Sequence, residues 1–143
     1  MRHLGIVASS IPNVTAPAVE ISAVTNFNQD RATLNGTVSA NNGLTTTIKF
    51  QRSTDNSNWI DATGGTTITN TSSNNVSVYY NTTGLANGTT YYIRLVATNA
   101  AGTTNSSSTS FITWSVRTYQ QTLTGTTTTT YNNAVYLQTI TPT

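Results

Sequence analysis

Charged side chains are scarce in this sequence, because Asp, Glu, Lys and Arg together make up only 7% of its 143 residues. Charged residues usually account for about a quarter of a globular chain. Four acids and one histidine, His3, leave little from which to build a general acid–base pair. The absence of cysteine excludes disulfides, thiolate metal sites and cysteine nucleophiles. The sequence therefore predicts a protein that is not an enzyme and that holds no cofactor or metal.

Basic patches and long apolar runs are also missing. The net charge is +2, and the six cations are scattered along the chain, which argues against a nucleic-acid partner. No run approaches the roughly 18 apolar residues of a membrane span, so we expect no membrane insertion. The apolar part of the N-terminus, Leu4 to Ala8, is shorter than the roughly 7–15 residues of a signal-peptide core. We therefore expect that the chain has no secretion signal and that it is synthesised in the cytoplasm.

Small polar residues dominate instead, since Thr, Asn and Ser occupy 64 of the 143 positions. These residues disfavour helices, and short runs of alternating apolar and polar residues predict strands. The predicted strands cover residues 19–24, 32–38, 46–52, a short stretch around Trp59-Ile60, residues near 66–68, and 76–80, 91–98 and 108–113. Short strands separated by turn residues every 8–12 positions indicate an all-β fold, an antiparallel β-sandwich.

One segment carries a family resemblance. It contains Leu85, a glycine turn at Gly88, Tyr91 at the start of an alternating strand, and then Asn99-Ala-Ala-Gly102. This pattern resembles the fibronectin type III domain, an immunoglobulin-like β-sandwich, over about residues 19–113. The resemblance implies that Leu85 closes one end of the sandwich and that the Tyr91 hydroxyl bonds to upstream backbone, as a tyrosine corner. Gly36 stands where the family usually has a core tryptophan, as in bacterial and phage-type versions.

Three segments follow from this interpretation: an extended N-terminal arm at 1–17, the sandwich at 18–113, and a C-terminal β extension at 114–143. Within the strand 91–98, alternation turns Ile93, Leu95 and Ala97 inward with Tyr91, and turns Tyr92, Arg94, Val96 and Thr98 outward. The predicted structural core comprises Leu34, Phe50, Leu85, Tyr91, Ile93 and Leu95.

The two arms carry apolar and aromatic residues outside the sandwich, and they are therefore the predicted interface. The candidates are Leu4, Ile6, Val7 and Ile11 in the N-terminal arm, and Trp114, Tyr119, Tyr131, Tyr136 and Leu137 in the C-terminal extension. The tail has two open alternatives: it pairs back as additional strands of the sandwich, or it lies across a neighbouring subunit. We expect both arms to become ordered only in an assembled state.

The few polar candidates for chemistry favour structural interpretations. Asp55 and Asp61 could approach each other across a hairpin, but a turn former and a strand-edge residue explain them better than an acid pair. Asp30 beside Arg31 indicates a surface ion pair rather than a calcium site. Trp59 fits a cap on the core better than an exposed platform for a sugar.

These observations favour a structural protein of a virus particle. The sandwich with an uncharged Thr/Asn-rich surface and two apolar arms is similar to small bacteriophage virion proteins with immunoglobulin-like domains. We expect a capsid decoration (cement) protein, or next a tail component, bound to a major capsid or other virion protein as a homo-oligomer or as lattice-bound copies. The alternatives are a carbohydrate-binding or adhesion module of a bacterial surface or phage tail-fibre protein, with a glycan as partner, and an accessory domain of an enzyme.

Overall fold

A computed structural model describes residues 14–40, 42–62, 68–120 and 134–139, and of residues 68–70, 118–120 and 134–139 it describes the backbone only. The strands in these ranges are β1 (Ala18–Ile21), β2 (Arg31–Ser39), β3 (Thr46–Ser53), β4 (Ile60–Asp61), β5 (Ile68–Asn70), β6 (Val76–Thr83), β7 (Thr90–Asn99), β8 (Gly102–Asn105), β9 (Thr109–Ile112), β10 (Ser115–Gln120) and β11 (Ala134–Thr139). None of the described residues forms a helix that is long and apolar enough to span a membrane.

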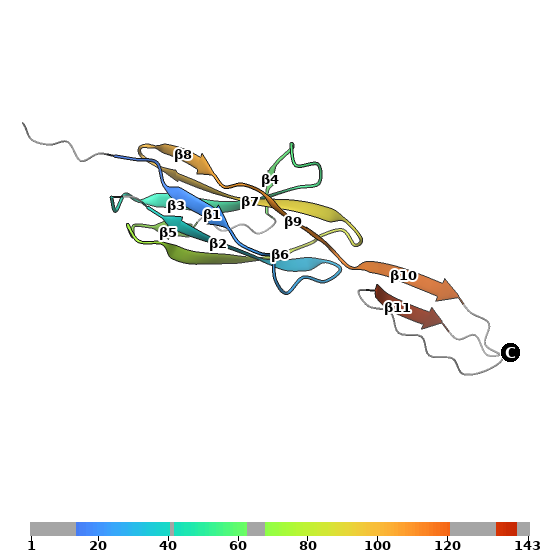
Figure 1. The fold of residues 1–143 in the computed structure, drawn as a ribbon. Helices are drawn as coiled ribbons and strands as arrows, with labels where there is room; N and C mark the ends of the chain where they lie inside the picture. The colour runs from blue at the N-terminus through green and yellow to red at the C-terminus, as the bar shows by residue number, and fades with distance from the viewer. Residues whose placement is uncertain (1–13, 41, 63–67, 121–133, 140–143) are drawn as a thin grey trace, which may run out of the picture.

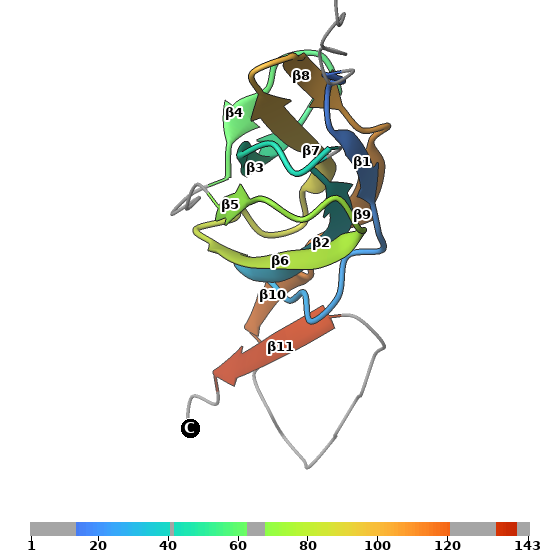
Figure 2. The same ribbon diagram turned by 90° about the vertical axis from the view of Figure 1, so that its left-hand side faces the viewer.

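The strands β1 to β9 form two antiparallel sheets that face each other as the layers of a sandwich (Figures 1 and 2). The smaller sheet has the order β1-β2-β6. The larger sheet has the order β4-β3-β7-β8, with β5 also pairing with β3 and β9 also pairing with β7. Burial alternates along β2 and β7, as expected of strands with one face on a core. The predicted fold class, an immunoglobulin-like and fibronectin III-like β-sandwich, is confirmed.

The core lies between the sheets. All six side chains assigned to it from the sequence are buried, namely Leu34, Phe50, Leu85, Tyr91, Ile93 and Leu95. At one end the core is aromatic, because the Phe111 ring centroid lies 6.0 Å from that of Tyr91 and 5.5 Å from that of Phe27. Burial of this apolar surface is the main stabilising contribution to the sandwich.

Gly36 lies where β1 and the opposite sheet leave no room for a side chain. A Cβ built at this residue would lie 2.7 Å from the carbonyl oxygen of Glu20 and 2.9 Å from Cδ2 of Leu95. Leu95 belongs to the opposite sheet, and Glu20 belongs to β1, which pairs with β2 beside Gly36. The space that a side chain would need is therefore filled from both directions, so glycine is required here for steric reasons.

We predict that Gly36→Ala lowers the free energy of unfolding by about 1–3 kcal/mol, because the added methyl group overpacks this contact. Thr37→Ala, at the next position of β2, is the matched control and should change stability much less. Chemical denaturation of both variants checks this. Equal unfolding free energies for Gly36→Ala and the unmodified chain would show that the contact relaxes without cost.

Side-chain hydrogen bonds hold the loop that connects β6 to β7, which lies at one end of the sandwich. The amide of Ala86 donates to the Tyr91 hydroxyl at 2.9 Å, which is the upstream backbone bond expected from the family resemblance. The Thr113 hydroxyl donates to the carbonyl oxygen of Ala86 at 2.7 Å and accepts from the amide of Thr89 at 2.9 Å. Buried Leu85 fills the space beneath. These bonds make the loop a fixed closure of the core.

Asn99 fastens the opposite end. Its side-chain oxygen accepts from the amides of Ala101 at 2.8 Å and Gly102 at 3.2 Å, which holds the turn between β7 and β8. Its side-chain nitrogen donates to the carbonyl oxygen of Thr15 at 2.9 Å. The Asn-Ala-Ala-Gly motif therefore forms the predicted turn and also holds the segment that enters β1.

Two details of the sandwich differ from expectation. Val96, predicted to face outward into solvent, is only 6% exposed, because β7 is a central strand and Val96 is flanked by Lys49 of β3 and Asn105 of β8. The sequence pattern also did not predict β8, which is a strand separate from β9. Ser106 divides them, since its hydroxyl and not a backbone group accepts from the Leu95 amide, at 2.9 Å.

The C-terminal extension forms its own sheet. β10 and β11 pair in parallel, from Ser115 opposite Ala134 to Gln120 opposite Thr139, and lie beyond one end of the sandwich (Figure 1). The alternative in which the tail adds strands to the sandwich is therefore wrong for the described strands. The chain is directed off the end because the Trp114 amide donates to the carbonyl oxygen of Asn28 and its carbonyl oxygen accepts from the amide of Gly88.

Candidate functional site

The outer face of the larger sheet carries an aromatic–cation pair. The Arg94 guanidinium carbon lies 4.3 Å from the centroid of the Trp59 ring, a cation–π contact. Trp59 is half-buried, and it lies outside the hydrophobic cluster between the sheets. The interpretation of Trp59 as a cap on the core is therefore wrong. The reason is that Arg94 projects from the solvent side of β7 and provides the indole with a partner there.

Hydrogen bonds extend this pair across the sheet. Arg94 donates from Nε and Nη2 to the Gln51 side-chain oxygen at 2.9 and 2.8 Å. The Gln51 side-chain nitrogen donates to Asp61 Oδ1 at 3.0 Å, and Lys49 Nζ donates to Asp61 Oδ2 at 3.2 Å. Four polar side chains from β3, β4 and β7 thus hold one another in fixed positions beside the indole of Trp59. We call these five residues the outer-face cluster.

Asp61 remains a carboxylate within this cluster. The hydrogen bond from Gln51, and then that from Lys49, lower the pKa of the Asp61 carboxyl below its ordinary value. A carboxyl with a lowered pKa is a poor proton donor near neutral pH. Asp61 therefore accepts hydrogen bonds within the outer-face cluster rather than donating a proton.

Asp55 is committed to a turn and does not meet Asp61. It accepts from the amides of Ser57 at 2.9 Å and Asn58 at 2.7 Å, and from the Ser53 hydroxyl at 2.8 Å. These bonds, with the Asn58 amide as the largest contributor, hold the pKa of the Asp55 carboxyl far below its ordinary value. Asp55 is thus a turn former and Asp61 a strand-edge residue. Within the described ranges no group of three or more metal-ligating side chains occurs.

We predict that Asp55 makes the fold sensitive to acid. Because its pKa is lower in the folded chain than the ordinary 3.8, its contribution to stability is present above that pH and is lost as pH falls below it. Asp55→Ala should be less stable than the unmodified chain at neutral pH, and the difference should shrink below about pH 3.8. Urea unfolding across pH, with Thr54→Ala as control, measures this. A difference that is the same at every pH would contradict the assignment.

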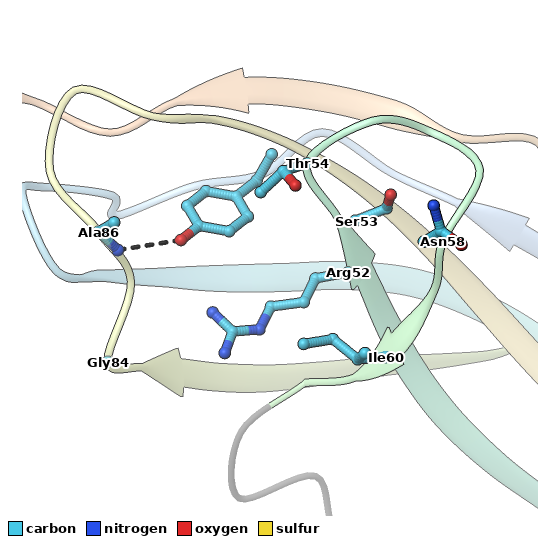
Figure 3. Close-up of a pocket in the computed structure, with 8 residues that line it drawn as sticks. Arg52, Ser53, Thr54, Asn58, Ile60, Gly84 and Ala86 are labelled. Atoms are coloured by element: carbon cyan, nitrogen blue, oxygen red, sulfur yellow. Dashed lines mark hydrogen bonds between the residues drawn. The ribbon is translucent and has the colours of Figure 1, made fainter.

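A pocket of about 360 Å³ opens at the end of the sandwich beside the tyrosine corner (Figure 3). Its lining residues are Arg52, Ser53, Thr54, Asn58, Ile60, Gly84, Ala86 and Tyr91. The Arg52 guanidinium carbon lies 5.6 Å from the centroid of the Tyr91 ring, and the Tyr91 hydroxyl is engaged by Ala86. This lining contains no carboxylate or imidazole, so it offers no acid–base pair for catalysis.

The structure places four of the nine predicted interface residues on or beside one feature. Trp114 is 36% exposed and immediately precedes β10. Tyr119 of β10 lies opposite Gln138, while Tyr136 and Leu137 of β11 lie opposite Arg117 and Thr118. The remaining five lie outside the described residues, namely Leu4, Ile6, Val7, Ile11 and Tyr131. The four candidates that the structure describes therefore all belong to the C-terminal extension.

Sequence reasoning missed the outer-face cluster and the most exposed apolar side chains. Tyr79 is 67% exposed, and Ile112 is 60% exposed. Alternation could have indicated them, because both flank buried inward positions on their strands. The contacts of Arg94 with Gln51 join strands 43 residues apart, so no local pattern announces them.

Comparisons with known proteins bear on the fold. No family profile matches the chain, and no curated protein matches it. Among solved structures, the sensor domain of the anti-sigma factor RsgI4 of Pseudobacteroides cellulosolvens aligns with 17% identity and a TM-score of 0.57, over 71% of this chain and 98% of that one. A fibronectin type III domain of the human KIAA0970 protein aligns with 11% identity and a TM-score of 0.48, over 68% and 73% of the two chains.

A redesigned β-sandwich protein aligns with 30% identity and a TM-score of 0.45, over 69% of this chain and 94% of that one. At 17% identity, the likeness to the sensor domain shows the fold alone. The strand order described above is that of an antiparallel β-sandwich, and the likeness to the sensor domain agrees with that fold.

Proposed function

We propose that this chain is a non-enzymatic structural module that attaches to neighbouring subunits through its C-terminal extension. One observation carries the proposal: β10 and β11 form a two-stranded parallel sheet, and no third strand joins it within the described residues. An isolated two-stranded sheet is at best marginally stable in water, and parallel sheets are normally covered on both faces. A neighbouring protein surface would supply the missing cover.

The register of this pair supports an apolar contact. Val116 lies opposite Val135, and Thr118 lies opposite Leu137. Positions two apart on a strand share a face, so one face of the pair groups Val116, Val135 and Leu137. Such a face binds a partner by burying apolar area, while the open strand edges bind by adding strands.

The setting that we propose is a bacteriophage particle, in which the chain decorates the capsid by contact with a major capsid or other virion protein. The near absence of charge, with 64 of 143 residues being Thr, Asn or Ser, suits a surface that forms many weak contacts in a repeating lattice. The likeness to an anti-sigma-factor sensor domain concerns the fold, and the proposal takes no role from that protein.

We predict that Leu137→Asp prevents incorporation into particles while leaving the sandwich folded. A charge on the apolar face would oppose its burial, and β11 has no strand neighbour in the sandwich. Ile112→Asp places the same charge on a 60% exposed side chain of β9 and is the matched control. Copy number per purified particle and the thermal midpoint of each free variant are the two measurements. Normal loading of Leu137→Asp would reject the extension as the attachment site.

A second candidate function, glycan binding, is favoured by the position of Trp59 on the outer face. Sugars stack on indole rings, and Gln51 and Asp61, which are linked to Trp59 through Arg94, carry amide and carboxylate groups that can bond to sugar hydroxyls. Neither the 17 asparagines nor the sandwich fold distinguishes a glycan-binding protein from other proteins. The support for glycan binding comes from the outer-face cluster alone.

A panel of immobilised glycans tests this candidate. The chain contains two tryptophans, so Trp114→Phe leaves Trp59 as the sole indole and its fluorescence reports on the outer face directly. We predict that a bound glycan changes this emission and that Trp59→Ala abolishes binding, whereas Trp114→Phe retains it. Absence of binding above background, or equal binding by Trp59→Ala, would eliminate the candidate.

A further inference from the structure

β6 is the longest open edge of the sandwich. It spans eight residues, Val76–Thr83, and pairs with β2 along its whole length. On its other side, no strand of the described chain pairs with it, so β6 forms the border of the smaller sheet (Figure 2). The backbone groups along such a border are a template for another strand.

The other borders of the sandwich carry features that disfavour strand addition. β1 has four residues, including the charged Glu20. On the border beside β3, β4 has two residues, one of them Asp61, and β5 has three. The border formed by β8 and β9 is interrupted at Ser106, where a side chain replaces a backbone group in the ladder. Short length, charge and irregularity are the devices by which proteins protect sheet edges.

β6 has none of these devices. Its sequence, Val-Ser-Val-Tyr-Tyr-Asn-Thr-Thr, lacks charge, proline and glycine, and its register with β2 runs without interruption. Val78 and Thr82 are buried in the sandwich, which fixes the strand in one register, while Tyr79 is 67% exposed. The edge is therefore long, neutral and rigid, with a large aromatic side chain at its middle.

We propose that β6 is an interface between two copies of this chain. The two β6 strands pair antiparallel around a two-fold axis perpendicular to the smaller sheet, and Tyr79 lies beside the second copy's Tyr79. Such an axis sets solvent-facing residues opposite solvent-facing residues, as continuous sheets require. A second copy is the favoured occupant because the strand is uncharged, so self-pairing opposes no like charges.

This interface gives a continuous six-stranded sheet, with the order β1-β2-β6 in each copy, and it is independent of the C-terminal extension. β6 and the pair β10–β11 belong to different sheets. One chain then has two separate means of joining neighbours, which is what a lattice component needs in order to extend in more than one direction.

Disulfide trapping tests the proposed register. The chain has no cysteine, so Tyr79→Cys introduces a single thiol. Directly opposed residues of antiparallel strands have Cα atoms about 4.5–5.5 Å apart, within the range of a disulfide. Under mild oxidation, full-length Tyr79→Cys should form a covalent dimer about tenfold or more faster than Ile112→Cys, a control of similar exposure. Equal rates would overturn the proposed pairing.

Charge variants provide a second readout by sedimentation equilibrium of the full chain. Tyr79→Lys should weaken the dimer about tenfold by placing like charges side by side, and Ile112→Lys should leave it unchanged. An equimolar mixture of Tyr79→Lys and Tyr79→Asp should restore association, because opposite charges then face each other. Leu137→Asp should leave the Tyr79→Cys crosslink intact, which separates this interface from the C-terminal one. A dimer whose dissociation constant is unchanged by Tyr79→Lys would reject the proposal. A chain that is still monomeric at 100-fold the protein concentration used for crosslinking would also reject it.

Discussion

The need of edge backbone groups for hydrogen-bond partners is the constraint on which this structure depends. Every strand of a sandwich presents amide and carbonyl groups to its neighbours, and the outermost strands present them to solvent. Most borders of the sandwich are short, charged or interrupted, as at β1, β4 and Ser106. Two places depart from this pattern: the uncharged β6 and the separate pair of β10 and β11. These are the two places where we propose that the chain joins other polypeptides.

Contacts within the sandwich hold the strands that carry these edges in place. Gly36 allows Leu95 and β1 to approach closely. The Tyr91 hydroxyl fastens the loop at one end, and Asn99 fastens the turn at the other. Strands held this firmly keep their register, and a fixed register is what allows an edge to recognise a second strand specifically.

The three aspartates hold local structure. Asp55 organises its loop, Asp61 is held as a carboxylate by Gln51 and Lys49, and Asp30 pairs with Arg31 on the surface at 3.2 Å. This distribution is consistent with a protein that acts by binding. The cluster around Trp59 adds a rigid, partly aromatic surface on the face opposite the core.

Local alternation predicted most strands and the core, because each inward position on β2 and β7 repeats every second residue. The roles of Leu85 and Tyr91 at one end of the sandwich came instead from the resemblance to the fibronectin type III pattern. Alternation failed for Val96, whose burial depends on the central place of β7, and for Trp59, whose partner Arg94 lies on a distant strand. The parallel pairing of β10 with β11 was equally hidden, because the residue pattern within a strand does not indicate the direction of its partner.

Hydrogen–deuterium exchange of the full chain at rising protein concentration tests most directly whether β10 and β11 are stabilised by binding to neighbouring chains. The account predicts that β7 amides are protected at every concentration, whereas amides of β10 and β11 exchange quickly in dilute solution and become protected as neighbours bind. Protection of β10 and β11 in the dilute monomer equal to that of β7 would contradict it, because the extension would then be stable without any partner.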